Sequence, residues 1–263
     1  MSDKFDRLVG IMERLRGGQG CPWDKKQTRE SLKPYLIEEA YEVLEAIEEK
    51  DANKLKEEFG DLLYQILFHS QISKEEGEFG IEDVLTTSSE KMVRRHPHVF
   101  GDVKAENAEE VLRQWEAIKK EEKGEDRKSI LEGVPPHLPA LLRAHQLQAR
   151  AARVGFDWEH VDHVFAKVKE EMGEFEEAFR AKDREEMESE LGDLLFALVN
   201  IGRFIEVNPE DALRKSISRF MSRFRHIEEE IARKGREWGD VSLDEMEMLW
   251  QEAKGLEKIR DAK

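Results

Sequence analysis

The chain has 263 residues, and its 59 Asp and Glu outnumber its 43 Lys and Arg, which leaves a formal charge of −16 at pH 7. An acidic balance spread along the chain repels phosphate backbones and anionic lipid, so we expect neither a nucleic-acid partner nor a membrane partner. No apolar stretch approaches the roughly eighteen residues of a membrane span, the first residues lack the apolar core of a signal peptide, and the single Cys21 suits a reducing compartment, so we expect a cytoplasmic protein.

The sequence is rich in strong helix formers and poor in alternating β-branched runs, which predicts an all-α fold. Helices are expected, in chain order, over residues 3–16, 30–49, 53–75, 80–95 and 107–122, and then over 138–153, 161–181, 184–206, 209–234 and 242–259. The stretch between these two groups is charged and ends in helix-breaking prolines. We therefore expect a first domain over 1–124, a linker over 125–136 and a second domain over 137–263.

The two groups of helices repeat one another. Aligned without gaps, residues 36–68 and 168–200 are identical at 12 of 33 positions. The shared positions include two acidic motifs: Glu38-Glu39-x-x-Glu42 recurs as Glu170-Glu171-x-x-Glu174, and Glu58-x-x-Asp61 recurs as Glu190-x-x-Asp193. A repeat of this length indicates two tandem copies of one helical-bundle domain rather than a solenoid.

The acidic motifs have the spacing of a metal site. Residues three apart share a helix face, and a short connection between two helices favours antiparallel neighbours, so the two pairs of each copy could face one another. Converging carboxylates repel unless a cation holds them, and oxygen donors favour Mg²⁺ or Mn²⁺ over zinc. A di-iron site would require Glu-x-x-His pairs instead. The candidate ligands in the first copy are Glu39, Glu42, Glu58 and Asp61.

The alternative is that these carboxylates are only solvated, because an acidic chain contains many pairs three apart by chance. Retention of both pairs in both copies, while the surrounding residues differ, favours a metal site over a solvated face.

Basic residues recur in a similar way. A polyphosphate bound at the metal would need cations for its remaining oxygens, although a basic pair on a helix can equally be an ordinary salt-bridged surface. The recurring pairs, each one helical turn apart, are Lys91 and Arg95 in the first copy and Arg219 and Arg223 in the second.

Three further residues are candidates for nucleotide contacts. Trp115 and Trp250 occupy corresponding places in the two copies and could stack on a base, although a tryptophan in an amphipathic helix is more often part of a core. Asn200 is polar within an apolar run and could bond to a ligand, and Phe68 replaces it in the first copy.

The duplicated acidic motifs, together with Cys21-Pro22-Trp23-Asp24 and the segment Arg94–Phe100, resemble those of the MazG family of nucleoside triphosphate pyrophosphohydrolases. The resemblance covers essentially the whole chain and is closest to the long, two-domain bacterial form. It implies an all-helical, Mg²⁺-dependent enzyme, usually a homodimer, that hydrolyses a broad range of nucleoside triphosphates to monophosphate and pyrophosphate and thereby controls nucleotide pools.

The resemblance also assigns residues. It implies metal ligands at Glu171, Glu174, Glu190 and Asp193, and nucleotide contacts at Lys167, Arg219, Arg223 and Trp250. In such proteins the second copy is the active domain and the first is structural or regulatory. Glu170 or a metal ligand would deprotonate the attacking water, and the spacing does not choose between them.

Two alternatives stay open at this point. One is a relative that shares the helical acidic site but prefers one substrate, such as dUTP, dCTP or phosphoribosyl-ATP. The other is a helical interaction module without catalytic activity, whose acidic faces are solvated.

Overall fold

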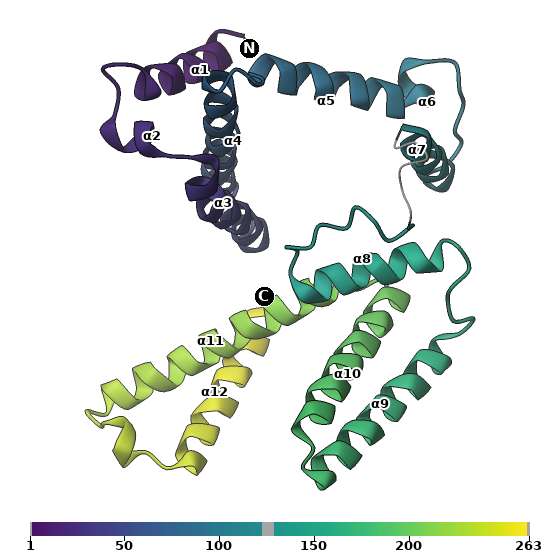
Figure 1. The fold of residues 1–263 in the computed structure, drawn as a ribbon. Coiled ribbons are helices and arrows are strands. Elements are labelled where there is room, and N and C mark those ends of the chain that lie inside the picture. The colour runs from purple at the N-terminus through teal and green to yellow at the C-terminus, as the bar shows by residue number, and fades with distance from the viewer. Residues whose placement is uncertain (1, 123–128, 262–263) are drawn as a thin grey trace. The chain divides into compact units, whose positions relative to one another are not determined.

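The computed structural model describes residues 2–122 and 129–261, and within these ranges every regular element is a helix (Figure 1). The prediction of an all-α fold is therefore confirmed. The chain divides into two compact units, Met1–Gly124 and Glu125–Lys263. None of the helices described combines the length and the apolar character needed to cross a bilayer.

The first unit is organised around a hairpin of two long helices, α3 and α4. Helix α1 packs against α4. Helix α5 follows α4 and contacts both α4 and α7. A core cluster joins α1, α3 and α4 through Met12, Leu32, Phe68 and Ile72. The helices of this unit are α1 (Ser2–Arg16), α2 (Pro22–Lys26), α3 (Arg29–Glu49), α4 (Ala52–Glu75), α5 (Ile81–Arg95), α6 (Pro97–Phe100) and α7 (Ala108–Glu122).

The second unit contains two hairpins, one of α9 with α10 and one of α11 with α12, and α8 packs against both α10 and α11. Ile227, Ile231 and Leu249 form a core cluster between α11 and α12. The elements of this unit are α8 (Ala140–Ala152), α9 (Val161–Ala181), α10 (Arg184–Phe204), α11 (Pro209–Arg233), the 3₁₀ turn η1 (Trp238–Asp240) and α12 (Leu243–Asp261).

The same Lys-Asp dipeptide turns the chain in the hairpins α3–α4 and α9–α10. Lys50 and Lys182 end their helices in the left-handed region, with φ of 57° and 58°. The next residue caps the following helix: the Asp51 carboxylate accepts from the backbone N–H groups two and three residues on, and Asp183 does the same. This two-residue connection keeps each pair of long helices adjacent, which places their acidic motifs side by side.

All ten predicted helices are present, with ends that differ by at most two residues. The sequence did not predict α2, α6 or η1, because elements of three to five residues are too short to show a helical period. Of the predicted linker, residues 125–128 lie outside the described residues, and 129–136 contain no helix.

Candidate active site

Three carboxylates of the second unit converge between α9 and α10. Glu171 and Glu174 project from α9 and Glu190 from α10, and one oxygen of each lies within 4.8 Å of the others. Glu171 is buried, Glu174 is exposed, and Glu190 lies between these extremes. Three carboxylate oxygens at this separation, supplied by two adjacent helices, suit a hard divalent cation.

Asp193, the fourth predicted ligand, lies one turn beyond Glu190 on α10 and is not one of the three converging groups. The charge of Asp193 nevertheless acts on Glu190. Burial raises the pKa of Glu190, and repulsion from Glu174, Glu186, Glu171 and Asp193 raises it further. The site thus concentrates negative charge that a bound cation would relieve.

Lys167 supplies one cation beside this cluster. Its Nζ lies 2.8 Å from Glu170 Oε1 and 2.5 Å from Glu171 Oε1, and these hydrogen bonds raise the pKa of the lysine. Lys167 therefore stays charged at neutral pH and holds the Glu170 carboxylate next to the buried Glu171.

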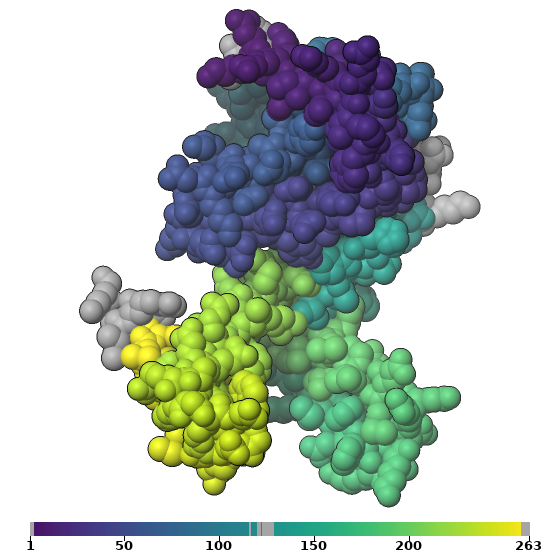
Figure 2. Space-filling model, turned by 90° about the vertical axis from the view of Figure 1, so that its left-hand side faces the viewer, coloured from purple at the N-terminus to yellow at the C-terminus, as the bar shows by residue number. Residues whose placement is uncertain are grey.

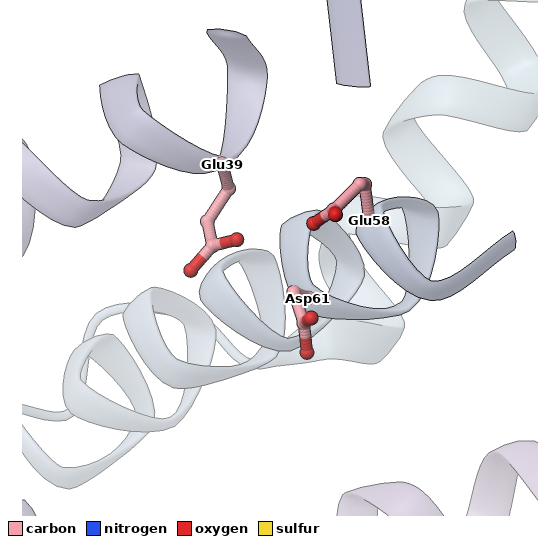
Figure 3. A group of neighbouring side chains, drawn as sticks. All are labelled: Glu39, Glu58 and Asp61. Carbon is pink, nitrogen blue, oxygen red and sulfur yellow. The ribbon is translucent and has the colours of Figure 1, made fainter. Parts of the chain in front are cut away.

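The first unit has its own carboxylate cluster. Glu39 from α3 and Glu58 and Asp61 from α4 offer oxygens within 4.8 Å of one another, and Figure 3 shows Glu39 extending from α3 toward the helix that carries Glu58 and Asp61. Burial raises the pKa of Glu39, and so does repulsion from Asp61 and Glu42. Glu42 is thus close to the cluster but outside its three converging groups.

The two clusters differ in their neighbours. Tyr35 occupies the position equivalent to Lys167 and packs edge-on against Trp23, so the first cluster has no corresponding lysine. Gln65 occupies the position equivalent to Ala197; it is 8% exposed, and hydrogen bonding from its side chain lowers the pKa of Glu39. The two sites are chemically distinct despite their shared motifs.

Unlike Lys167, the other two predicted basic contacts of the second unit lie on the hairpin of α11 and α12. Arg219 is exposed on α11 and donates to Ser216 Oγ at 2.7 Å. Arg223, also on α11, is ion-paired with Glu257 on α12 at 2.7 Å and lies over the ring of Trp250. The two hairpins form separate lobes of this unit in Figure 2, and no contact described in the structure joins either arginine to the carboxylates.

Asn200 lies on α10, two turns beyond Asp193. Its Oδ1 accepts a hydrogen bond of 2.9 Å from Arg203 Nε, and Arg203 is ion-paired in turn with Asp157 in the loop before α9. The structure therefore ties Asn200 to this loop and not to the carboxylate cluster.

The sequence signature of the MazG nucleotide pyrophosphohydrolase domain matches residues 27–100 and 160–228, which together make up more than half of the chain. The chain belongs to the MazG family. The two matched MazG segments contain both carboxylate clusters, one in each unit.

Full-length MazG relatives support this assignment. The nucleoside triphosphate pyrophosphohydrolase/pyrophosphatase MazG of Thermotoga maritima is 49% identical over 95% of this chain and 96% of its own. The nucleoside triphosphate pyrophosphohydrolase of Escherichia coli K12 is 46% identical over 97% of this chain and 98% of its own. The protein YabN of Bacillus subtilis is 51% identical over 97% of this chain but only 52% of its own length, so the same two-copy region also occurs within a longer chain.

Two acidic residues of this MazG chain were missed by the sequence analysis: Glu257, which binds Arg223, and Glu122, which binds Arg95 in the first unit. Each glutamate follows a tryptophan by seven residues, and this shared spacing was the signal that could have found them.

Proposed function

We propose that the second unit hydrolyses nucleoside triphosphates to nucleoside monophosphate and pyrophosphate, with Mg²⁺ held by Glu171, Glu174, Glu190 and Asp193. The observation that carries this proposal is the convergence of carboxylates beside Lys167 in a chain of the MazG family. Mn²⁺, which accepts the same oxygen donors, would substitute for Mg²⁺.

A bound Mg²⁺ would supply positive charge to the phosphate oxygens and acidify a water molecule. The proton of the attacking water would go to Glu170, which Lys167 binds, or to one of the cluster carboxylates, whose oxygens lie within 4.8 Å of one another. Lys167 donates two hydrogen bonds to these carboxylates, so it keeps Glu170 beside the reacting water and offers a third donor to a phosphate oxygen.

The substrate also needs groups for its pyrophosphate and its base. Arg219 and Arg223 would stabilise the charge that develops on the leaving pyrophosphate, because a guanidinium presents several donors to phosphate oxygens. Trp250 would stack on the base. Asn200, whose oxygen is already engaged by Arg203, keeps its amide N–H groups for the nucleotide.

The first unit is proposed as a second cation site with a structural or regulatory role, formed by Glu39, Glu42, Glu58 and Asp61. Tyr35 stands where the second unit has Lys167, and only the more distant charge of Lys54 opposes the rise in the pKa of Glu58 that burial and repulsion cause. A cation would relieve the remaining repulsion and stabilise the hairpin.

A homodimer is also proposed. The hairpin of α9 and α10 exposes a series of large apolar side chains, more than a monomer usually leaves in water, and a second copy would cover them. They are Phe165, Met172, Phe179, Leu191 and Leu195. Sedimentation equilibrium tests this: a single species of 30.7 kDa at micromolar concentration would refute the dimer.

The activity is tested by incubating the protein with each NTP and dNTP, with and without Mg²⁺, and measuring pyrophosphate and orthophosphate separately. We expect Mg²⁺-dependent release of pyrophosphate from many nucleotides. Release of orthophosphate would place the cleaved bond elsewhere. Turnover of one nucleotide alone, such as dUTP, would show a substrate-selective enzyme, and no turnover at all would favour a non-catalytic module.

A further inference from the structure

We propose that Glu257 is a positioning residue that holds the Arg223 guanidinium ready for the phosphates of the nucleotide. This inference rests on the proposed role of Arg223 as a nucleotide contact. It assigns a role to a carboxylate outside the metal cluster and outside the acidic motifs.

The contact between the two side chains is specific. Arg223 Nε and Nη2 both donate to Glu257 Oε2, at 3.0 and 2.7 Å, and the guanidinium carbon lies 5.3 Å from the centre of the Trp250 ring. The side chains are only 19% and 16% exposed, so water screens the pair incompletely. Glu257 and Trp250 together fix the orientation of the guanidinium plane.

This arrangement leaves donors available. A guanidinium has five N–H groups, and the bonds to Glu257 use one edge of it. Among the described contacts of Arg223, Nη1 makes no hydrogen bond. Glu257 therefore orients the arginine without consuming the edge that could bind a phosphate in a bidentate manner.

There is space for an anion beside the pair. Arg223 and Glu257 line a cavity of about 280 Å³ together with Ser222, Arg225 and His226. His226 Nε2 is buried and has no hydrogen-bond partner within the part of the chain that the structure describes. The carboxylates of Glu229 and Glu257 also line this cavity, and His226 Nε2 lies 3.9 Å from Glu252 Oε2. An anion would therefore bind beside Arg223 and Arg225 at the edge of the guanidinium that Glu257 leaves open.

The first unit repeats the contact of arginine with glutamate and tryptophan, with an added bond of 2.6 Å from Arg94 Nε to Glu122 Oε1. Arg95 Nε and Nη2 both donate to Glu122 Oε2, at 2.9 and 2.5 Å, and the guanidinium carbon lies 5.2 Å from the centre of the Trp115 ring. In each unit the glutamate follows the tryptophan by seven residues, two turns along one helix face. An incidental surface ion pair contributes little and would not be expected to persist with the same donor atoms in two diverged copies.

The expected effect is on substrate binding. Without Glu257 the long arginine side chain samples many rotamers, and the nucleotide has to order it upon binding. We therefore expect Glu257→Ala to raise KM for Mg²⁺–ATP about tenfold while kcat changes less than about threefold. Glu257→Gln, which keeps an acceptor oxygen, should restore part of the affinity.

The matched control is Glu245→Ala. It removes another glutamate of α12 that is ion-paired with an arginine after α11, at Arg236 Nη1, 2.7 Å away. We expect this variant to lower Tm but to keep the KM of the unmodified protein. Circular dichroism and Tm are recorded for every variant, and Glu257→Gln serves for the kinetics if Glu257→Ala does not fold.

Arg223→Ala separates failure of this inference from failure of the proposed function. An unchanged KM in Arg223→Ala would show that the arginine does not bind nucleotide. If Arg223→Ala raises KM but Glu257→Ala and Glu257→Gln do not, Glu257 has no positioning role. A lower KM in Glu257→Ala would also overturn the inference, because Glu257 would then compete with the phosphate. If Glu257 acts only through Arg223, the double variant Arg223→Ala/Glu257→Ala should have the same KM as Arg223→Ala alone. A higher KM in the double variant would contradict a positioning role.

Discussion

Neutralising Glu174 should move activity and stability in opposite directions. Its carboxylate has an oxygen within 4.8 Å of those of Glu171 and Glu190. Two unit charges at that separation repel by about 3 kcal/mol at an effective dielectric constant of about 20. Exposure of Glu174 reduces this to about 1 kcal/mol. Glu174→Gln should therefore raise Tm of the metal-free protein by about 3 °C.

The same change removes one ligand of the proposed cation. Loss of a residue that only supports a metal ligand already costs about 10- to 100-fold in affinity or activity, so we expect kcat/KM to fall at least about 100-fold. The assay measures pyrophosphate from Mg²⁺–ATP at several Mg²⁺ concentrations. The control is Glu176→Gln, which changes an exposed glutamate of the same helix that is paired with Arg180, and which should keep full activity.

The reasoning is refuted if Glu174→Gln keeps its activity. Loss of activity in Glu42→Gln alone would then place the reaction in the first unit. Full activity in both Glu174→Gln and Glu42→Gln would show that neither acidic cluster supports the reaction. A lower Tm in Glu174→Gln without metal would contradict the repulsion that the geometry predicts.

Further predictions concern the two-residue connection between α9 and α10, the dependence of Tm on pH, and stabilisation by Mg²⁺. Lys182→Gly should raise the free energy of unfolding by about 1 kcal/mol, because φ of 58° strains a residue with a Cβ, and urea unfolding would show a higher midpoint. Asp183→Ala should lower the free energy of unfolding by about 1 kcal/mol, because the N-terminal cap of α10 is lost. An unchanged urea midpoint would mean that this cap contributes nothing to stability. Hydrogen bonds from Arg236 and from the Ser242 backbone N–H lower the pKa of Glu245 from 4.5 to about 2. These contacts therefore stabilise the fold above about pH 4.5 and are lost as the pH falls toward 2, so Tm of Glu245→Gln should decline less over that interval. Mg²⁺ should raise Tm, and the rise should shrink in Glu190→Gln, whereas equal shifts in both proteins would locate the ion elsewhere.

Much of the fold and part of the site could be predicted from the sequence. Long helices show their period over several turns, so all ten were found, and the repeat alone related Glu39 to Glu171 and Glu58 to Glu190. Short elements such as α2 carry no such period. The pairing of Arg223 with Glu257 was not predicted, because 34 residues and a turn separate them and no local rule sets the angle between α11 and α12.

The sequence by itself determined the helical class, the duplication and the acidic motifs, because each depends on spacing along one helix or on identity between two segments. Only the tertiary structure decided which carboxylates converge: Glu174 joins Glu171 and Glu190, whereas Asp61 takes the third place in the first unit. The packing of neighbouring helices and the choice of rotamer set these distances. The structure likewise placed Lys167 on the Glu171 carboxylate and Arg223 between Glu257 and Trp250, contacts that depend on side-chain direction in three dimensions.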